Sequence, residues 1–344
     1  MCGRVFSNRP IPHAILERFR GLTVEWGDGR WWERARKSTV LINWFTPVTG
    51  EMLSDPGCLR LIIARSSGYD HIDVKAAEEK GVCVANQPEI ISEAVAEQAL
   101  AGILAALRRL VDRHSYFPKW EQQGWPTHLA GGLVAGRRVG LLGAGRIAVS
   151  LLVKLLPFRP SKILYYSRTP KPRLEQAYGA ERVSLDELFM ESDILVNSLP
   201  LNDETRGLVT DDLLALLPEG AVYVNVGRGG TEGDGAVYKA WERRPDLFFV
   251  LDVHPEEPLP MGSPRAKLYG KPRIIMTPHT AGYSVESRVG TTLLSLMQAK
   301  HFLDEGCVWN PVNKACRPCG SKRMNIWEVI AEARRIASEI GLKP

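Results

Sequence analysis

Residues 139–148 read Val-Gly-Leu-Leu-Gly-Ala-Gly-Arg-Ile-Ala and decide the fold, because they join an apolar strand to a helix through a G-x-G-x-x-A turn. Gly143 permits the tight turn, and Gly145 lets the backbone approach a pyrophosphate group. The final alanine is small enough for strand and helix to pack closely. The amides of Arg146 and Ile147 begin the helix, where they face the phosphate charge. The stretch therefore predicts a dinucleotide-binding site.

Short apolar stretches alternate with helical patterns on both sides of this turn, which is typical of parallel βαβ units. Strands are predicted at 40–42, 61–64 and 82–85 before the turn, and at 163–166, 194–198, 221–226, 248–251 and 274–276 after it. Long helical patterns at 92–110 and 284–303 are expected to connect the two series. We expect an α/β fold with two Rossmann-like domains, each built on a doubly wound parallel sheet. The dinucleotide-binding domain is expected at 99–290, and the substrate-binding domain at 1–98 and 291–344.

The composition is that of an ordinary globular protein of 344 residues, with a net charge of +5 from 44 Lys and Arg against 39 Asp and Glu. The basic residues are spread along the sequence, which argues against a nucleic-acid-binding surface. No stretch of about 18 uninterrupted apolar residues occurs, and the N-terminus lacks the apolar core of a signal peptide. Six cysteines are too few for a disulfide scaffold in a chain of this length. These features favour a cytoplasmic enzyme with reduced thiols and no membrane partner.

The end of the strand at 163–166 bears on the choice of dinucleotide, because Ser167, Arg168 and Thr169 follow it. A site for NAD usually has Asp or Glu at this point, which binds the 2′-hydroxyl of the ribose. Two hydroxyls and a guanidinium instead form a receptor for a 2′-phosphate, with Lys171 as a further positive charge. The sequence therefore predicts a preference for NADP(H). Use of NAD(H) stays open, since Arg168 can also stack on the adenine.

Three further segments, each at the end of a predicted strand, carry an arginine, a glutamate and a histidine: Arg228, Glu257 and His279. These are the groups needed to reduce a 2-oxo acid. The arginine binds and polarises the carbonyl and carboxylate, the histidine gives a proton to the developing alkoxide, and the glutamate keeps that histidine protonated. Taken singly, each also fits a simpler role, as a loop arginine, a solvated acid or a helix-capping histidine.

Taken in order, these segments resemble the D-isomer-specific 2-hydroxyacid dehydrogenase family over nearly the whole chain, to about Asn313. Residues 4–7 resemble the opening strand of that family. The Ser-Ser-Gly-Tyr-Asp-His-Ile-Asp stretch at 66–73 resembles its substrate loop, and 199–205 resembles the segment beside the nicotinamide. Among the branches, the Tyr-Tyr-Ser-Arg-Thr stretch at 165–169 is most similar to glyoxylate/hydroxypyruvate reductases.

The resemblance implies that Arg228, Glu257 and His279 are the catalytic residues. It also implies that the backbone amides of Ser67 and Gly68 bind the substrate carboxylate. The substrate is then a small 2-oxo acid, held in a cleft between the two domains.

The resemblance further implies a cofactor site that includes Pro200, Asp252 and Gly282. By this resemblance, Asp252 forms a hydrogen bond with the nicotinamide carboxamide and so fixes which face of the nicotinamide ring is turned toward the substrate. A homodimer formed through the cofactor domains, and a hinge that closes over ligand, are also implied.

The chain departs from the family pattern after the catalytic arginine, where 229–235 is unusually rich in glycine. The aspartate expected there falls at Gly233, with Glu232 and Asp234 on either side. The loop at 259–272 is also longer than usual, which affects how glutamate and histidine align.

The substrate side departs as well. Arg65 directly precedes the substrate loop, and Trp44 and Phe45 end a strand that borders the pocket. We assign Arg65 to substrate binding, where it favours a doubly anionic substrate, with a structural role as the alternative. Trp125 lies in an excursion at 117–128 and either reaches the pocket of a neighbouring subunit or packs locally.

The C-terminal extension at 314–344 is the largest departure, since the family normally closes before it. A helix is predicted at 325–340, and its buried face comprises Ile326, Val329, Ile330, Ile336 and Ile340. The Cys-x-x-Cys at 316–319 can join Cys307 and His301 in a metal site or form a disulfide. We expect no metal, and a helix that docks on its own domain or extends a dimer.

The expected function is NADPH-dependent reduction of glyoxylate or hydroxypyruvate. Oxidation of phosphoglycerate, lactate or phosphite on the same scaffold is the alternative within the class. A dinucleotide-sensing binding protein is the alternative outside it. The formate-oxidising branch fits less well. The resemblance implies a glutamine before the proline in that branch, where this chain has Glu257.

Overall fold

The computed structural model describes residues 3–27, 29–320 and 325–342, so Cys2 and two short parts of the C-terminal extension lie outside it. The chain forms two compact units. The central unit comprises residues 93–282, and the terminal unit comprises residues 1–92 together with 283–344. Each unit contains one parallel sheet, which confirms the α/β fold with two doubly wound domains.

The central unit is built on a seven-stranded parallel sheet. Its strands lie in the order β12 (Ile274–Met276), β11 (Phe248–Leu251), β10 (Val222–Asn225), β9 (Ile194–Asn197), β6 (Arg138–Leu142), β7 (Lys162–Tyr166) and β8 (Glu181–Arg182). The strand order reverses between β6 and β9. From β6 the chain passes to β7 on one side, and from β9 it passes to β10 on the other. In open parallel sheets ligands bind beyond the carboxyl ends of the strands at such a point.

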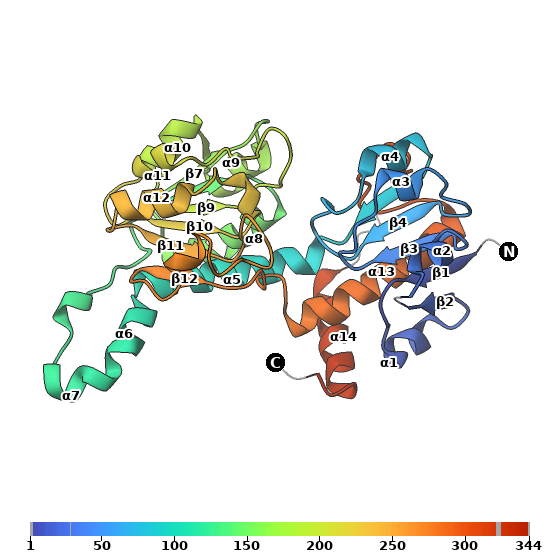
Figure 1. Ribbon diagram of the computed structural model, residues 1–344, viewed down its shortest axis with the longest axis horizontal. Helices are drawn as coiled ribbons and strands as arrows, with labels where there is room; N and C mark the ends of the chain where they lie inside the picture. Colours follow the sequence, from blue (N-terminus) through green and yellow to red (C-terminus); the bar gives the residue numbers. More distant parts are fainter. Residues whose placement is uncertain (1–2, 28, 321–324, 343–344) are drawn as a thin grey trace. The chain divides into compact units, whose positions relative to one another are not determined.

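Helices cover both faces of this sheet (Figure 1). Helices α10 (Leu185–Glu191), α11 (Asp211–Ala215) and α12 (Ala236–Arg243) lie on one face, and α5 (Glu89–Leu107) lies on the other. The remaining helices are α8 (Arg146–Leu155), α9 (Pro172–Tyr178), α6 (Leu110–Tyr116) and α7 (Trp120–Gln123). Gly102 allows α5 to approach the sheet, because a Cβ there would lie 2.5 Å from a methyl group of Val250.

Helix α5 is also the one helix, within the described residues, that is long and apolar enough to cross a membrane by composition. From the sequence we expected no membrane-spanning stretch, because no run of uninterrupted apolar residues is long enough. Helix α5 contains a few polar residues, but its mean hydropathy over the window is still 1.6. Since 56% of the window is buried within the molecule, α5 has the character of a core helix, which passes the same test.

The terminal unit contains a five-stranded parallel sheet with the order β2 (Thr23–Trp26), β1 (Arg4–Ser7), β3 (Val40–Asn43), β4 (Leu61–Ala64) and β5 (Cys83–Asn86). One face packs against α1 (His13–Leu16), α13 (Val285–Glu305) and α14 (Ile326–Glu339). The other packs against α2 (Trp31–Ala35), α3 (Gly50–Leu53) and α4 (Val74–Glu79). The β3 and β4 side chains are buried throughout, as expected for strands covered on both faces.

Helix α14, in the C-terminal extension, docks on its own unit. Val329 and Ile336 are buried, as the sequence pattern predicts, and Ala333 lies in the same core as α13 and the sheet. An ion pair between Arg18 and Glu332, with the two atoms 2.8 Å apart, joins the helix to the chain beside α1. Docking, rather than extension away from the unit, is thus the arrangement observed.

The expectation of reduced thiols is wrong for four cysteines. Cys316 is disulfide-bonded to Cys83 of β5, and Cys319 is disulfide-bonded to Cys307. The Cys-x-x-Cys residues therefore pair with cysteines outside the motif, 233 and 12 residues away, and not with each other. His301 does join this group, since its Nε2 lies 3.0 Å from Sγ of Cys319. Both bonds attach the extension to the terminal unit.

Candidate active site

The predicted site residues of the central unit gather at one edge of its sheet. Hydrogen-bonded register aligns the last residues of neighbouring strands, with Leu142 opposite both Tyr166 and Asn197. On the other side of β9, Asn225 is opposite Leu251, which is opposite Met276. Because the strands are parallel, every segment that follows them leaves from this carboxyl edge.

The glycine turn after β6 has the conformation that the sequence predicts. Gly143 has a φ of +93°, and a Cβ there would lie 3.2–3.3 Å from the backbone and side chain at Ser198 and Leu199. A Cβ on Gly145 would instead point into open space. Helix α8 starts directly afterwards at Arg146, so its first amides have no partner within the helix. An open backbone face at a helix N-terminus, at the point where the strand order reverses, suits a pyrophosphate group.

The chain after β7 forms a basic, hydroxyl-rich surface. The hydroxyl of Ser167 donates to the carbonyl of Thr169 at 2.7 Å, and Lys171 donates to the hydroxyl of Thr169 at 3.2 Å. Nη1 of Arg168 lies 2.7 Å from Oε2 of Glu204, and Arg168 is 73% exposed. Arg182, which the sequence reading did not include, donates to the carbonyls of Ser167 and Arg168 at 3.1 and 3.0 Å.

His279 and Glu257 form the hydrogen-bonded pair that was predicted. Nδ1 of His279 lies 2.5 Å from Oε2 of Glu257, while Oε1 of Glu257 accepts from the amide of His254 at 2.9 Å. Burial by itself raises the pKa of the Glu257 carboxyl, but the hydrogen bonds from His279 and His254 outweigh burial and lower the pKa. The longer loop between glutamate and histidine therefore does not separate them. Nε2 of His279 is the ring nitrogen left to act as an acid.

Asp252 holds the segment that carries this histidine. Its buried carboxylate accepts from the hydroxyl of Thr277 at 2.5 Å and from the amides of Thr280 and Ala281 at 2.9 Å each. The amide of His279 donates to the Asp252 carbonyl at 2.7 Å. A carboxylate has about four acceptor positions, so three bonds still leave one for a ligand amide.

Arg228 lies in a loop whose glycines allow it to pack closely against neighbouring backbone. A Cβ on Gly229 would lie 2.0 Å from the carbonyl carbon of His254, and one on Gly227 would lie 2.7 Å from the carbonyl oxygen of Leu199. The glycines on either side of Arg228 thus let its loop lie close to the chain after β11 and β9, and of the two only Gly229 belongs to the glycine-rich stretch at 229–235. Arg228 itself donates to the carbonyl of Gly227 at 2.9 Å.

Glu232 takes a structural role beneath this loop, one that the sequence reading left open. Its fully buried carboxylate is ion-paired with buried Arg265 and accepts from Asn225 at 2.7 Å and from Tyr223 at 3.1 Å. Asn197 joins the network by donating to Tyr223 and to the Thr231 hydroxyl. Burial raises the pKa of Tyr223, so its hydroxyl keeps its proton.

Arg265 belongs to the loop at 259–272, which had seemed only an insertion, and nothing in the local sequence marks it as a partner of Glu232. Asn197 and Asn225 carried one usable signal, since each is a polar residue at the last position of a buried strand. The polar network was therefore only partly readable from sequence.

The predicted carboxylate-binding loop belongs to the terminal unit and leaves the carboxyl end of β4. The carbonyl of Ser66 accepts from the amide of Gln87 at 3.0 Å, and that of Ser67 accepts from Asn86 at 2.7 Å. The Ser66 hydroxyl donates to the carbonyl of Gly68. Within the described chain, no protein group accepts from the amides of Ser67 and Gly68. Two adjacent amides are thus available to an anion.

Arg65 does not extend from this loop into solvent. It is only 6% exposed, and its Nη1 donates to the carbonyl of Arg288 at 2.9 Å and to the hydroxyls of Thr291 and Thr292. Its Cζ lies 3.4 Å from the centre of the Trp44 ring. Both the structural role and a ligand-facing role considered from sequence are compatible with this position.

Comparison with known proteins identifies the relatives of this chain. A family model for the NAD-binding domain of D-isomer specific 2-hydroxyacid dehydrogenases matches residues 100–281. A glyoxylate reductase of Aeropyrum pernix is 34% identical over 330 residues, which cover 90% of this chain and 96% of the relative.

Two solved structures extend this similarity to the whole fold. An NADPH-dependent glyoxylate/hydroxypyruvate reductase of Sinorhizobium meliloti, in complex with NADP and malonate, matches with a TM-score of 0.76 and 26% identity over 92% of this chain and 99% of that one. A D-lactate dehydrogenase of Aquifex aeolicus, complexed with NAD and lactic acid, matches with a TM-score of 0.76 and 25% identity over 90% and 98%.

Proposed function

Because the chain belongs to the D-isomer-specific 2-hydroxyacid dehydrogenase family, we propose that it reduces glyoxylate or hydroxypyruvate and that it prefers NADPH over NADH. As a member of this family it is an oxidoreductase that acts on small 2-hydroxy or 2-oxo acids. The observation that carries the proposal is the pairing of His279 with Glu257 at the carboxyl edge of a dinucleotide-binding sheet. Similarity to glyoxylate reductases supports the substrate.

In the proposed reaction the chain's own groups bind the 2-oxo acid and deliver its proton. The bound cofactor supplies a hydride to the carbonyl carbon. His279 donates a proton from Nε2 to the carbonyl oxygen, and Glu257 holds the ring through Nδ1 so that this nitrogen faces the substrate. Arg228 polarises the carbonyl oxygen and binds the carboxylate, which the amides of Ser67 and Gly68 also bind. Asp252 keeps the histidine segment in place.

The NADPH preference rests on the surface after β7. Arg168, Lys171 and Arg182 lie there with the hydroxyls of Ser167 and Thr169, and no carboxylate ends the strand. A 2′-phosphate carries about two negative charges and several acceptor oxygens, so it gains charge-assisted hydrogen bonds that a 2′-hydroxyl does not. Pro200 and Gly282 are assigned to the same cofactor site on the family pattern.

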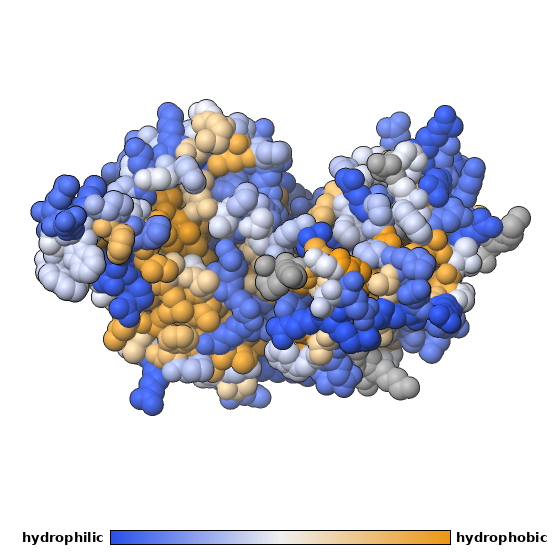
Figure 2. Space-filling model, turned by 90° about the horizontal axis from the view of Figure 1, so that it is seen from below, coloured by the Kyte–Doolittle hydropathy of each residue, from blue (hydrophilic) through white to orange (hydrophobic). Residues whose placement is uncertain are grey.

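We also propose that the enzyme is a homodimer formed through the central units, while the cytoplasmic location stays a prediction against which the two disulfides count. The arm that contains α6 and α7 projects from the sheet of its unit (Figure 1) and exposes large apolar side chains, with Phe117 69% and Trp125 79% exposed. Figure 2 shows further apolar residues gathered on the surface of this unit next to the arm. Light scattering of wild type and of Trp125→Ser tests the assembly, which the variant should weaken. Cell fractionation tests the location.

The proposed function is tested by following NADPH and NADH oxidation at 340 nm with glyoxylate, hydroxypyruvate, pyruvate and 3-phosphohydroxypyruvate. Turnover of glyoxylate or hydroxypyruvate, faster with NADPH at limiting cofactor, is the expected result. Turnover of pyruvate alone would indicate a lactate dehydrogenase instead. Cofactor binding without turnover of any substrate would favour a dinucleotide-sensing protein.

A further inference from the structure

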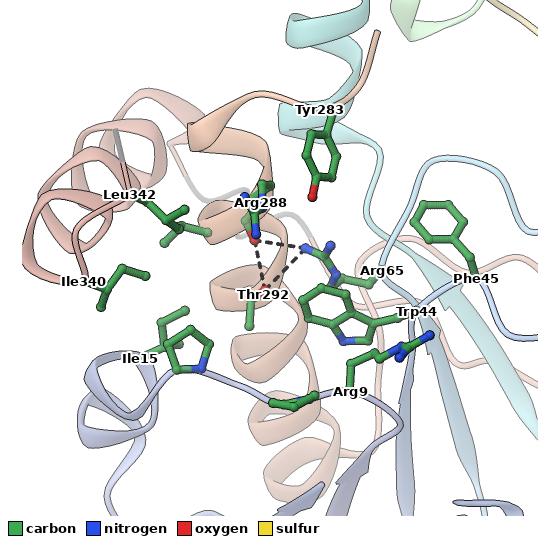
Figure 3. Close-up of a pocket in the computed structure, with 13 residues that line it drawn as sticks. Arg9, Ile15, Trp44, Phe45, Arg65, Tyr283, Arg288, Thr292, Ile340 and Leu342 are labelled. Carbon is green, nitrogen blue, oxygen red and sulfur yellow. Dashed lines mark hydrogen bonds between the residues drawn. The ribbon is translucent and has the colours of Figure 1, made fainter. Parts of the chain in front are cut away.

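A cavity of about 430 Å³ opens in the terminal unit at the carboxyl ends of β1, β3 and β4 (Figure 3). Its polar lining carries three arginines, Arg9, Arg65 and Arg288, together with Trp44 and Tyr283. No carboxylate lines it within residues 3–27, 29–320 and 325–342. A concave site with several cations and no anion of its own has the electrostatics of an anion-binding site.

Two donors in the wall of this cavity lack any acceptor within the described part of the chain. Nε of Arg65 and Nε1 of Trp44 are both buried, and neither has a hydrogen-bond partner. A buried polar group that lacks a hydrogen bond costs about 1–3 kcal/mol of stability, and more when the group is charged. Both donors therefore gain most from a ligand that accepts hydrogen bonds.

Arg65 is fixed in place without being neutralised. Its Nη1 is bonded to α13, and its guanidinium stacks on the Trp44 ring, so its position is set before any ligand arrives. Burial, with the charge of Arg288 nearby, lowers the pKa of Arg65 to about 9, as expected for a cation that has no counter-anion. A second anchor is the exposed Arg9, whose charge is free to turn toward a ligand.

The cavity has an apolar side as well. In Figure 3 Ile15, Ile340 and Leu342 lie together on the left, whereas Arg9, Trp44 and Phe45 lie on the right. Of the three guanidinium groups only that of Arg65 is shielded from water, and this burial strengthens its interaction with a ligand charge. The apolar walls also suit a carbon chain that carries the charge.

We propose that this cavity binds a second anionic group at the far end of larger substrates, so that, besides glyoxylate or hydroxypyruvate, the enzyme accepts 2-oxo acids with a distal carboxylate or phosphate and reduces them faster than their neutral analogues. The inference rests on the proposed reduction of 2-oxo acids. Its link to that reaction is Arg65 itself, which directly precedes the loop whose Ser67 and Gly68 amides receive the first carboxylate. The distal charge then lies against Arg9, Arg65 and the Trp44 indole N–H.

The test compares pairs of 2-oxo acids in which one member carries a distal anionic group and the other does not. The ratio of kcat/KM for 2-oxoglutarate over 2-oxopentanoate, and for 3-phosphohydroxypyruvate over hydroxypyruvate, is measured in wild type. At least one ratio should exceed about tenfold, the discrimination expected from one hydrogen-bonded charge. Ratios near one for both pairs would overturn the proposal.

Variants then locate the effect. Arg9→Gln and Arg65→Met should each lower the elevated ratio about tenfold, and Arg20→Gln, an exposed arginine of the same unit outside the cavity, should leave it unchanged. Since loss of buried Arg65 can disturb folding, Arg9→Gln and Arg288→Gln provide the decisive comparison. An elevated ratio that none of the cavity variants lowers would contradict this site.

Calorimetry with inorganic phosphate separates this inference from the proposed function. Phosphate should bind the wild-type enzyme without cofactor and bind Arg9→Gln more weakly. Phosphate binding that Arg9→Gln weakens, without turnover of any 2-oxo acid, would reject the proposed function and support anion recognition by the cavity, whereas phosphate binding that Arg9→Gln leaves unchanged would place the anion at the cofactor site and overturn the inference. Phosphate binding with substrate ratios near one would show a site for free anions and overturn the assignment to the substrate.

Discussion

The guanidinium of Arg168, at the end of β7, is ion-paired with the carboxylate of Glu204, 36 residues later in the segment after β9. The two side chains are 73% and 62% exposed, so the pair adds little to stability. It spans the two strand ends between which the cofactor is expected to lie. In the proposed binding of NADPH, a 2′-phosphate would replace Glu204 as the partner of Arg168.

This pair gives a prediction for cofactor selectivity. Arg168→Ala should weaken NADPH binding about 10- to 100-fold, the value of a charge-assisted hydrogen bond, and change NADH binding little. Glu204→Gln should act in the opposite direction and tighten NADPH binding, because it frees Arg168. Fluorescence titration of both cofactors measures this, with the exposed Arg173→Ala as control. Equal losses for NADPH and NADH in Arg168→Ala would exclude a phosphate receptor.

The role of His279 is tested by removing the proton donor. His279→Ala should lower the rate of 2-oxo acid reduction by about 10²–10⁴-fold, because proton transfer from a positioned side chain contributes that much. NADPH affinity should stay within about twofold of wild type, since the ring is assigned to the substrate. Exposed His13→Ala serves as control. Near-normal turnover in His279→Ala would reject the role.

Glu257 should make stability depend on pH in the acid range. Its pKa is lowered in the folded protein, so its contribution is fully present above its unfolded pKa of about 4.3 and is lost as pH falls through the folded value. The difference in unfolding free energy between wild type and Glu257→Gln should therefore shrink below about pH 4. Denaturant melts between pH 6 and pH 3 measure it. Glu256→Gln should follow the wild-type profile, and a difference independent of pH would contradict the assignment.

The buried pair of Glu232 and Arg265 should contribute far more than a surface pair. Arg265→Met leaves a buried carboxylate uncompensated, which should cost about 3–5 kcal/mol of unfolding free energy. Arg243→Met, which breaks surface ion pairs with Asp211 and Asp212, should cost only about 1 kcal/mol. Urea unfolding of both variants makes the comparison. Similar losses in the two would mean that the network beneath Arg228 is not buried as described.

The disulfide between Cys83 and Cys316 should stabilise the terminal unit, because it closes a loop of 233 residues. The double variant Cys83→Ser with Cys316→Ser should lose about 2–4 kcal/mol of unfolding free energy, and each single variant should lose about as much. Dithiothreitol should lower the melting temperature of wild type more than that of the double variant. An unchanged melting temperature of wild type under reducing conditions would argue against both bonds.

Much of this protein follows from local sequence. The turn at 139–148, the buried strands and the order of motifs determine two parallel α/β units, because each depends on residues close together in the chain. The partnership of His279 with Glu257 was also predictable, since both follow adjacent parallel strands and so leave from one edge. In a parallel sheet all strands run in the same direction, so the segments that follow neighbouring strands begin at the same edge.

Other features were decided only by tertiary structure. Arg265 meets Glu232, and Cys83 meets Cys316, across 33 and 233 residues, and no local pattern selects among the possible partners. Arg65 looked like a pocket residue, yet its contacts with α13 and Trp44 fix how it faces the cavity. The sequence alone determined which chemical groups are present and at which strand ends they stand. Packing between residues far apart in the chain decided which of these groups are buried, which are paired and which are left to bind a ligand.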